Sequence, residues 1–204
     1  RSTLFPYTTL FRSLAENLTA GVLAKKMGFP IDRFIAASNA NDSITRYLEE
    51  GRYEPKPTVT TLSTAMDVGN PSNFARLLHL YNGDHRAMGE DIQGISVSDE
   101  ATLDTIRDVF RRYGYVLDPH TAVGFRALET YRQTSGDSLP GIVLSTAHPA
   151  KFIEVIDIAL ENRMLENRME IPERLAAVLE RKKRATPIAA DYHELAEFLA
   201  HLDR

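Results

Sequence analysis

The residues best placed to do chemistry lie in the segment 141–152, whose sequence is GIVLSTAHPAKF. Residues 142–144 form a short apolar run, which is typical of a strand buried in a sheet. Two hydroxyls, Ser145 and Thr146, follow this run directly. In open α/β sheets, ligands bind at the carboxyl ends of strands. The segment therefore predicts a site for a small polar molecule.

Three further polar clusters begin helical patterns: residues 17–21, 63–74 and 118–124. The free N–H groups and the dipole at the start of a helix favour the binding of phosphate. Each cluster also fits an ordinary helix cap or a surface loop, so the residues alone leave both interpretations open. Taken together, they indicate a domain that binds a small polar or phosphorylated molecule.

Single titratable residues near these clusters have a chemical and a structural interpretation. His120 and His148 could carry protons, but a structural role in a first turn, in a core or at a cap is more common for such histidines. Lys151 could form a Schiff base. Nothing in the sequence indicates an apolar pocket around it, so a solvated or phosphate-steering lysine is favoured. The sequence contains no zinc pattern, Walker loop, G-x-G-x-x-G or G-x-S-x-G, and no metal site is predicted.

The elements that must position these residues alternate along the chain. Strands are predicted at residues 33–38, 95–97, 115–117 and 142–144, and helices at 19–27, 43–50, 72–81, 99–113, 120–132 and 150–160. Helix caps are expected at Asn17 or Thr19, and at Asp42, Ser72, Ser98 and Asp118. Residues 82–94 are polar and contain glycine, which favours a loop. Alternating strands and helices predict an α/β fold with an open, mostly parallel sheet flanked by helices.

Composition excludes several classes of protein. The net charge is −4, which gives no support to nucleic-acid binding. The absence of cysteine excludes disulfides and thiolate metal sites and is compatible with the cytoplasm. No apolar run approaches the roughly 20 residues of a membrane span. We therefore expect a cytoplasmic protein with a small-molecule partner and no membrane or nucleic-acid partner.

Three regions are expected along the chain. Residues 1–13 repeat Thr-Leu-Phe and resemble translated sequencing adaptor, so we interpret them as non-native and leave them out of the fold prediction. A native hairpin or tail is the alternative. Residues 14–160 are predicted to form the α/β domain. Residues 161–204 are predicted to form a helical tail, with helical patterns at about 172–183 and 192–202.

Five segments together resemble the threonine synthase family, which uses pyridoxal 5′-phosphate and has the tryptophan-synthase-β-like fold. They are NLTAGVLAKKMG, RFIAASNAND, STAMDVGNPSNF, DPHTAVG and LSTAHPAKF, in the family's order, and they cover most of residues 17–160. The resemblance implies a carbon–oxygen lyase that converts O-phospho-L-homoserine and water to L-threonine and phosphate. It further implies that the chain is a C-terminal fragment, whose partner is the missing N-terminal half of the same protein.

The resemblance also implies roles for individual residues. Thr146 matches the hydroxyl that faces the pyridine nitrogen of the cofactor, and the adjacent Ser145 is not distinguished from it by sequence. Asn17 and Thr19 match the end of the loop that binds the cofactor phosphate. Three residues of the segment 63–74 are assigned to the substrate: Asn70, Ser72 and Asn73.

The sequence departs from the family pattern at the catalytic lysine. The family's Schiff-base lysine has a Ser-Phe-Lys-Asp setting, which none of the six lysines shares: Lys25, Lys26, Lys56, Lys151, Lys182 and Lys183. The chain is therefore expected to contain no catalytic residue and to be inactive alone. Two alternatives are another pyridoxal-phosphate lyase, such as a threonine or serine dehydratase, and a non-catalytic phosphate-binding or interaction module.

Overall fold

A parallel sheet lies at the centre of the fold. The computed structural model describes residues 7–9, 14–161, 171–179, 181–182, 185–189 and 191–201. Its strands have the order β3-β2-β1-β4, and every neighbouring pair is parallel. The strands are β1 (Tyr7–Thr9), β2 (Phe34–Ser38), β3 (Ile92–Ser96) and β4 (Gly141–Val143). The predicted α/β class with a parallel sheet flanked by helices is confirmed.

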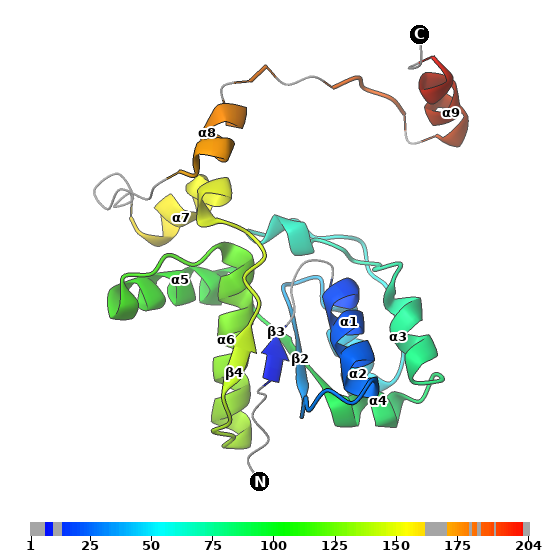
Figure 1. Ribbon diagram of the computed structural model, residues 1–204, viewed down its shortest axis with the longest axis vertical. Helices are drawn as coiled ribbons and strands as arrows, with labels where there is room; N and C mark the ends of the chain where they lie inside the picture. Colours follow the sequence, from blue (N-terminus) through cyan, green and yellow to red (C-terminus); the bar gives the residue numbers. More distant parts are fainter. Residues whose placement is uncertain are drawn as a thin grey trace. The chain divides into compact units, whose positions relative to one another are not determined.

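Strand β2 is buried on both faces, as its continuous apolar sequence requires. Because side chains alternate along a strand, Phe34 and Ala36 pack into one hydrophobic cluster and Ile35 and Ala37 into another. Helices α1 to α4 lie on the first side of the sheet and α6 on the second (Figure 1). These helices are α1 (Leu14–Lys26), α2 (Ser43–Glu50), α3 (Phe74–Leu80), α4 (His85–Asp91) and α6 (Pro119–Ser135).

A third hydrophobic cluster joins α6 to two further helices, α5 (Asp99–Tyr113) and α7 (Ile153–Ala159). Its buried members include Ile106 of α5, Ala122 of α6 and Ile156 of α7. A short 3-10 helix, η2 (Pro149–Phe152), leads into α7, and another, η1 (Thr64–Met66), interrupts the long connection between α2 and α3. The segment after β4 is therefore fixed by the sheet at one end and by this cluster at the other.

Two of the predicted helix caps are confirmed. Ser98 begins α5 and accepts a hydrogen bond from the Ala101 N–H, and Asp118 begins α6 with Pro119 at the first helical position. The cap predicted at Asp42 is wrong in its chemistry. Asp42 occupies the N-cap position of α2, but its carboxylate binds Arg46 one turn along instead of a backbone N–H.

Other element predictions need correction. The expected loop at 82–94 contains α4, capped by Asp84, and the first residues of β3. A predicted strand is also absent. Residues 115–117 form no strand, because Leu117 is buried against helices in the third cluster and not in the sheet.

Two predicted helix starts are displaced. Helix α1 begins at Leu14, so Asn17 and Thr19 lie inside it and neither occupies the predicted N-cap position. Asn73, and not Ser72, occupies the N-cap position of α3.

Strand β1 lies in the segment that the fold prediction left out. Thr8 pairs with Phe34 of β2 on one side and with Ile142 of β4 on the other, so three residues connect the two halves of the sheet. Residues 1–6 and 10–13 lie outside the described residues. The boundaries 1–13, 14–160 and 161–204 stay predictions.

The chain divides into two compact units, Arg1–Met169 and Glu170–Arg204. The second contains α8 (Glu173–Leu179) and α9 (Tyr192–Ala200), where helical patterns are predicted, and Asp191 caps α9. Within the described residues, none of the helices is both long and apolar enough to cross a membrane.

A group of polar side chains connects α1 to α4 beside the first cluster. Lys25 Nζ lies 2.6 Å from Asp91 Oδ1, and the Tyr81 hydroxyl donates to Asp91 Oδ2 at 2.8 Å. Burial raises the pKa of the Asp91 carboxyl, but the hydrogen bonds from Lys25 and Tyr81 and the charges of Lys25 and Lys26 outweigh it, so the pKa lies below its ordinary value. Burial, followed by the hydrogen bond and charge of Asp91, raises the pKa of Tyr81.

This arrangement predicts a pH-dependent contribution to stability. Because the pKa of Asp91 is lower in the folded chain, its contribution is complete above the unfolded pKa of about 4 and is lost as the pH falls through the folded value. We expect Asp91→Asn to lower the free energy of unfolding by about 1 kcal/mol at pH 7, with the difference shrinking below about pH 4. Urea denaturation across pH measures this. The exposed Asp108→Asn is the control, and a difference that grows on acidification would contradict the prediction.

Candidate functional site

The candidate site lies where the parallel strands end. Asn39 follows β2, Val97 follows β3, and Ser145 and Thr146 come shortly after β4. Since all strand pairs are parallel, these ends share one edge of the sheet, as the sequence predicts. Leu144, between β4 and Ser145, packs against the first hydrophobic cluster. The packing of Leu144 therefore fixes the point at which the segment with the two hydroxyls begins.

A pocket of about 520 Å³ opens beside Ser145 and Thr146. Most of its polar lining consists of hydrogen-bond donors, and no carboxylate is among the described residues that line it. The lining residues are Tyr115, Val116, Ser145, Thr146, Ala147, His148, Pro149 and Lys151. Such a set of donors suits a ligand that carries anionic groups or an aromatic nitrogen acceptor.

His148 is a capping residue, in agreement with the favoured structural interpretation. Its Nδ1 accepts a hydrogen bond from the Ala150 N–H at 3.2 Å at the start of η2. When the ring is neutral, its proton must then lie on Nε2. Lys151 is exposed and forms no ion pair with any other described residue. This agrees with a solvated lysine at the rim of the pocket.

Asp118 lies at the centre of a buried network that faces the same edge. Its carboxylate caps α6 by accepting from the His120 N–H at 3.0 Å. The same carboxylate accepts from His120 Nδ1 at 2.9 Å and from the Thr121 hydroxyl. Thr121 Oγ1 also lies 3.2 Å from Ser145 Oγ. The Asp118 network, defined as Asp118, His120, Thr121, Ser145 and Ala65, therefore connects the start of α6 to the loop after β4.

His120 has a structural role, so its interpretation as a proton carrier is not supported. The Ala65 N–H donates to His120 Nε2 at 3.1 Å, which means that Nε2 carries no proton. Nδ1 must then be protonated and donate to Asp118. The ring is 2% exposed and packs on Phe152 with centroids 4.7 Å apart. Both nitrogens are used, and the neutral ring joins η1, α6 and η2.

The segment 63–74 is fixed by a second network. Asp67 Oδ1 accepts from Asn39 Nδ2 at 2.8 Å and from Thr61 Oγ1 at 2.7 Å, and its Oδ2 accepts from the Thr61 N–H at 2.9 Å. Asn41 donates to the same carboxylate at 3.1 Å. Asn39 is buried at the end of β2, so the network attaches this segment to the carboxyl edge of the sheet.

Gly69 allows this segment to pass close to a neighbouring loop. A Cβ at Gly69 would lie 2.1 Å from the Lys56 carbonyl oxygen, and the Gly69 carbonyl accepts from the Ser43 hydroxyl at 2.6 Å. We expect Gly69→Ala to lower the free energy of unfolding by about 2 kcal/mol, because two backbone segments must separate. Gly89→Ala is the matched control, since nothing lies near its Cβ and α4 should gain about 0.5–1 kcal/mol. Equal effects in urea denaturation would contradict the explanation.

The residues assigned to substrate are not among those that line the pocket beside Thr146. Asn70 is exposed and accepts from the Tyr53 hydroxyl at 2.9 Å, Ser72 is exposed, and Asn73 is half-buried at the start of α3. None of them lines that pocket, and neither Asn17 nor Thr19 does so. Ser145 and Thr146 are therefore the predicted site residues that the described pocket brings together. The other assignments stay predictions.

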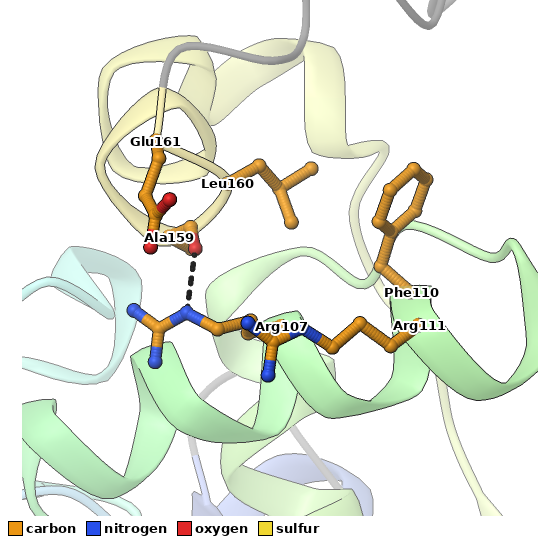
Figure 2. Close-up of a pocket in the computed structure, with 6 residues that line it drawn as sticks. All are labelled: Arg107, Phe110, Arg111, Ala159, Leu160 and Glu161. Atoms are coloured by element: carbon orange, nitrogen blue, oxygen red, sulfur yellow. Dashed lines mark hydrogen bonds between the residues drawn. The ribbon is translucent and has the colours of Figure 1, made fainter.

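A second pocket, of about 210 Å³, lies between α5 and the end of α7 (Figure 2). Arg107 Nε donates to the Ala159 carbonyl at 3.1 Å and so connects the two helices. The other residues that line this second pocket are Phe110, Arg111, Leu160 and Glu161. The pocket contains none of the predicted site residues, and no group of three His, Asp or Glu that could bind a metal occurs among the described residues.

Comparisons with known proteins identify the family. A family model described as pyridoxal-phosphate dependent enzyme matches residues 15–144, more than half of the chain. The chain belongs to the pyridoxal-phosphate dependent enzyme family. A second model, described as the C-terminal part of threonine synthase, matches residues 121–199. The two matches overlap over residues 121–144, which include most of α6 and all of β4.

The individual relatives and solved structures that match this chain include threonine synthases. Threonine synthase of Serratia marcescens is 40% identical over 91% of this chain. The crystal structure of threonine synthase from Escherichia coli matches 95% of the chain with a TM-score of 0.78 and 34% identity. A pyridoxal-phosphate-bound threonine synthase from Brucella melitensis matches 96% with a TM-score of 0.77 and 28% identity. The chain spans 41%, 43% and 46% of these relatives' lengths, respectively.

The Asp118 network is the part of the site that the sequence interpretation missed. Asp118 and His120 are recognisable as a cap and a first-turn histidine. Ala65, the partner of His120, and Ser145, the partner of Thr121, lie far from them in the sequence. No local spacing indicates such contacts. The signal available from sequence was the density of small polar residues in all three segments.

Proposed function

We propose that this chain is the C-terminal portion of a threonine synthase, and that the whole protein converts O-phospho-L-homoserine and water to L-threonine and phosphate. The observation that carries the proposal is the pair of hydroxyls at the end of β4, in a pocket of donors within a fold that matches threonine synthases over 95% of the chain. The five matching sequence segments support it. A similar fold alone would not support the proposed function, since one fold can carry many different reactions.

The residues present suit pyridoxal 5′-phosphate. When bound, the cofactor supplies an electron sink for the carbon atoms of the substrate, and the protein supplies binding and orientation. Thr146 would donate a hydrogen bond to the ring nitrogen without adding a charge. A neutral hydroxyl, unlike a carboxylate, does not favour protonation of that nitrogen. The absence of a carboxylate from the described lining of the pocket supports this role.

The remaining site assignments belong to the same proposal. Asn17 and Thr19 would contribute to the binding of the cofactor phosphate near the start of α1. Asn70, Ser72 and Asn73 would contribute to the binding of substrate near the start of α3. The lysine that binds the cofactor covalently would come from the remaining part of the same protein, because none of the six lysines here has the Ser-Phe-Lys-Asp setting. That part is also the proposed partner of this chain.

Two further assignments are proposed with the function. Residues 1–13 are taken as non-native because of their repeated Thr-Leu-Phe, with 14–160 and 161–204 as the cofactor-binding domain and the helical tail. The cytoplasm is taken as the location, which the cysteine-free sequence supports.

The test begins with the upstream reading frame in the source DNA. We expect an in-frame Ser-Phe-Lys-Asp segment in the upstream reading frame, which would also decide whether residues 1–13 are native. The full-length protein should then release phosphate from O-phospho-L-homoserine and form threonine, whereas the 204-residue chain should do neither. A frame without that segment, or a full-length protein that binds the cofactor but releases no phosphate, would refute the proposal. Keto-acid formation from threonine or serine without phosphate release would favour the dehydratase instead.

A further inference from the structure

The second pocket, between α5 and the end of α7, has charged groups of both signs around an apolar wall. Arg107 lies three and four residues before Phe110 and Arg111 on α5, which places the three side chains on one face of that helix. Leu160 and Glu161, at the end of α7, lie across from the two arginines (Figure 2). The lining shares no residue with the 520 Å³ pocket at the end of β4, so the two pockets are separate.

The two guanidinium groups leave hydrogen-bond donors for a ligand. Arg107 donates through Nε to the Ala159 carbonyl and through Nη1 to Asp104, which fixes its side chain. Its Nη2 donates to no other residue in the described part of the chain. Arg111 is exposed, and it forms neither a hydrogen bond nor an ion pair with another described residue. Because guanidinium groups bind carboxylates through parallel N–H donors, this side of the pocket suits a carboxylate.

Glu161 supplies the opposite charge from a position that favours glycine. It follows Leu160, the C-cap of α7, and has a φ of 56°. A side chain is strained in this left-handed conformation, which is why glycine is the usual residue directly after a helix. Glu161 nevertheless lines the pocket, and it forms no ion pair within the described residues. Strain of this kind persists at sites that bind ligands.

The apolar wall and the volume restrict the ligand further. Leu160 is 4% exposed and Phe110 packs on the third hydrophobic cluster, so the wall is fixed. The volume of about 210 Å³ is smaller than the roughly 300–1,000 Å³ of pockets that bind drug-sized molecules. A polyanion would be repelled by Glu161, and a neutral apolar molecule would leave the charged groups unpaired. A small molecule with one charge of each sign satisfies both sides.

We propose that the second pocket binds a free α-amino acid with a small aliphatic side chain. The carboxylate of the ligand accepts hydrogen bonds from Arg107 and Arg111, and its ammonium group donates to Glu161. Its side chain packs on Leu160 and Phe110. This inference goes beyond the proposed function, because none of these residues is assigned to the cofactor or the substrate and no cofactor is needed for binding.

Equilibrium dialysis of the 204-residue chain with radiolabelled L-alanine, L-valine and L-leucine tests the proposal. We expect saturable binding of at least one of them, with one site per chain. The amide of that amino acid, which has no carboxylate, and its deaminated analogue, which has no ammonium group, should each bind about tenfold more weakly or worse. Absence of saturable binding for all three amino acids, or equal binding of the amide, would overturn the proposal.

Two substitutions of exposed side chains test the assigned charges. Arg111→Gln and Glu161→Gln should each weaken binding about tenfold. Arg76→Gln, which changes an exposed arginine of α3, is the matched control and should leave the affinity unchanged. Unchanged affinity in both Arg111→Gln and Glu161→Gln would show that binding occurs elsewhere and would overturn the proposal.

Glu161→Gly separates binding from folding. Glycine adopts the left-handed conformation without strain, so this variant should have a higher midpoint in urea while it loses binding. Such a loss cannot result from unfolding. Retained binding in Glu161→Gly would contradict the role of the carboxylate. The same variants in the full-length protein without cofactor keep the test decisive if the chain alone aggregates.

Discussion

Replacement of Asp118 by alanine is expected to lower the free energy of unfolding of the chain by about 3 kcal/mol. The substitution removes the N-cap of α6 and leaves the His120 Nδ1–H and the Thr121 hydroxyl buried without their acceptor. It also frees the loop that contains Ser145. Urea denaturation with an unchanged m-value would show that the effect is on stability and not on the denatured state.

Ser98→Ala is the matched control for this substitution. The Ser98 hydroxyl caps α5 by accepting a hydrogen bond from the Ala101 N–H, and it takes part in no comparable buried network in the described part of the chain. The loss of such a cap costs about 1 kcal/mol. The difference between the two losses in free energy of unfolding therefore measures the contribution of the Asp118 network beyond that of the helix cap. Equal losses would mean that the contacts of Asp118 with His120 and Thr121 contribute nothing beyond capping.

In the full-length protein, Thr146→Val is expected to lower kcat/KM for phosphate release by about tenfold to a hundredfold, the equivalent of about 1.4 to 2.8 kcal/mol. Valine keeps the shape of threonine but cannot donate a hydrogen bond. Thr146→Ser should recover most of the activity, because the donor returns. The measurement is steady-state phosphate release, with the cofactor content of each variant determined first.

Ser145→Ala provides the comparison for that result. The Ser145 hydroxyl is already in contact with the Thr121 hydroxyl, at 3.2 Å, so its loss should reduce kcat/KM several-fold less than Thr146→Val does. If Ser145→Ala were the more damaging change, the roles of the two hydroxyls would be reversed. If neither mattered, the pocket at the end of β4 would not be the cofactor site.

The sequence predicts the fold well where a signal is local. The caps at Ser98 and Asp118 and the apolar run of β2 are correctly placed because short-range hydrogen bonds and periodicity determine them. Strand β4 forms at Gly141–Val143, but its Ile142 is exposed and not buried as the apolar run indicates. Helix α4 was missed since its sequence, HRAMGED, has one strongly buried residue, Met88, and contains a glycine. Residues 115–117 were predicted as a strand because burial against helices gives the same apolar signal as burial in a sheet.

The candidate site likewise has a part that local sequence predicts and a part that depends on distant contacts. Ser145 and Thr146 follow a strand in sequence, so the rule for parallel sheets finds them. The Ser145 hydroxyl contacts Thr121 of α6, and the position of the segment 63–74 depends on Asn39 and on the neutral ring of His120. These are contacts between distant parts of the chain, and a single sequence contains no periodicity that reports them.

The short connection from β4 to η2 also has a consequence for protein engineering. Residues 144–148 span the whole distance from strand to helix, which makes the motif look like a cassette that could be grafted onto another parallel sheet. The Ser145 hydroxyl, however, is held by a contact with Thr121 in the first turn of α6. A graft that transfers residues 141–152 alone would therefore copy the sequence of the site without the contact that holds Ser145. The smallest portable unit also includes residues 118–121.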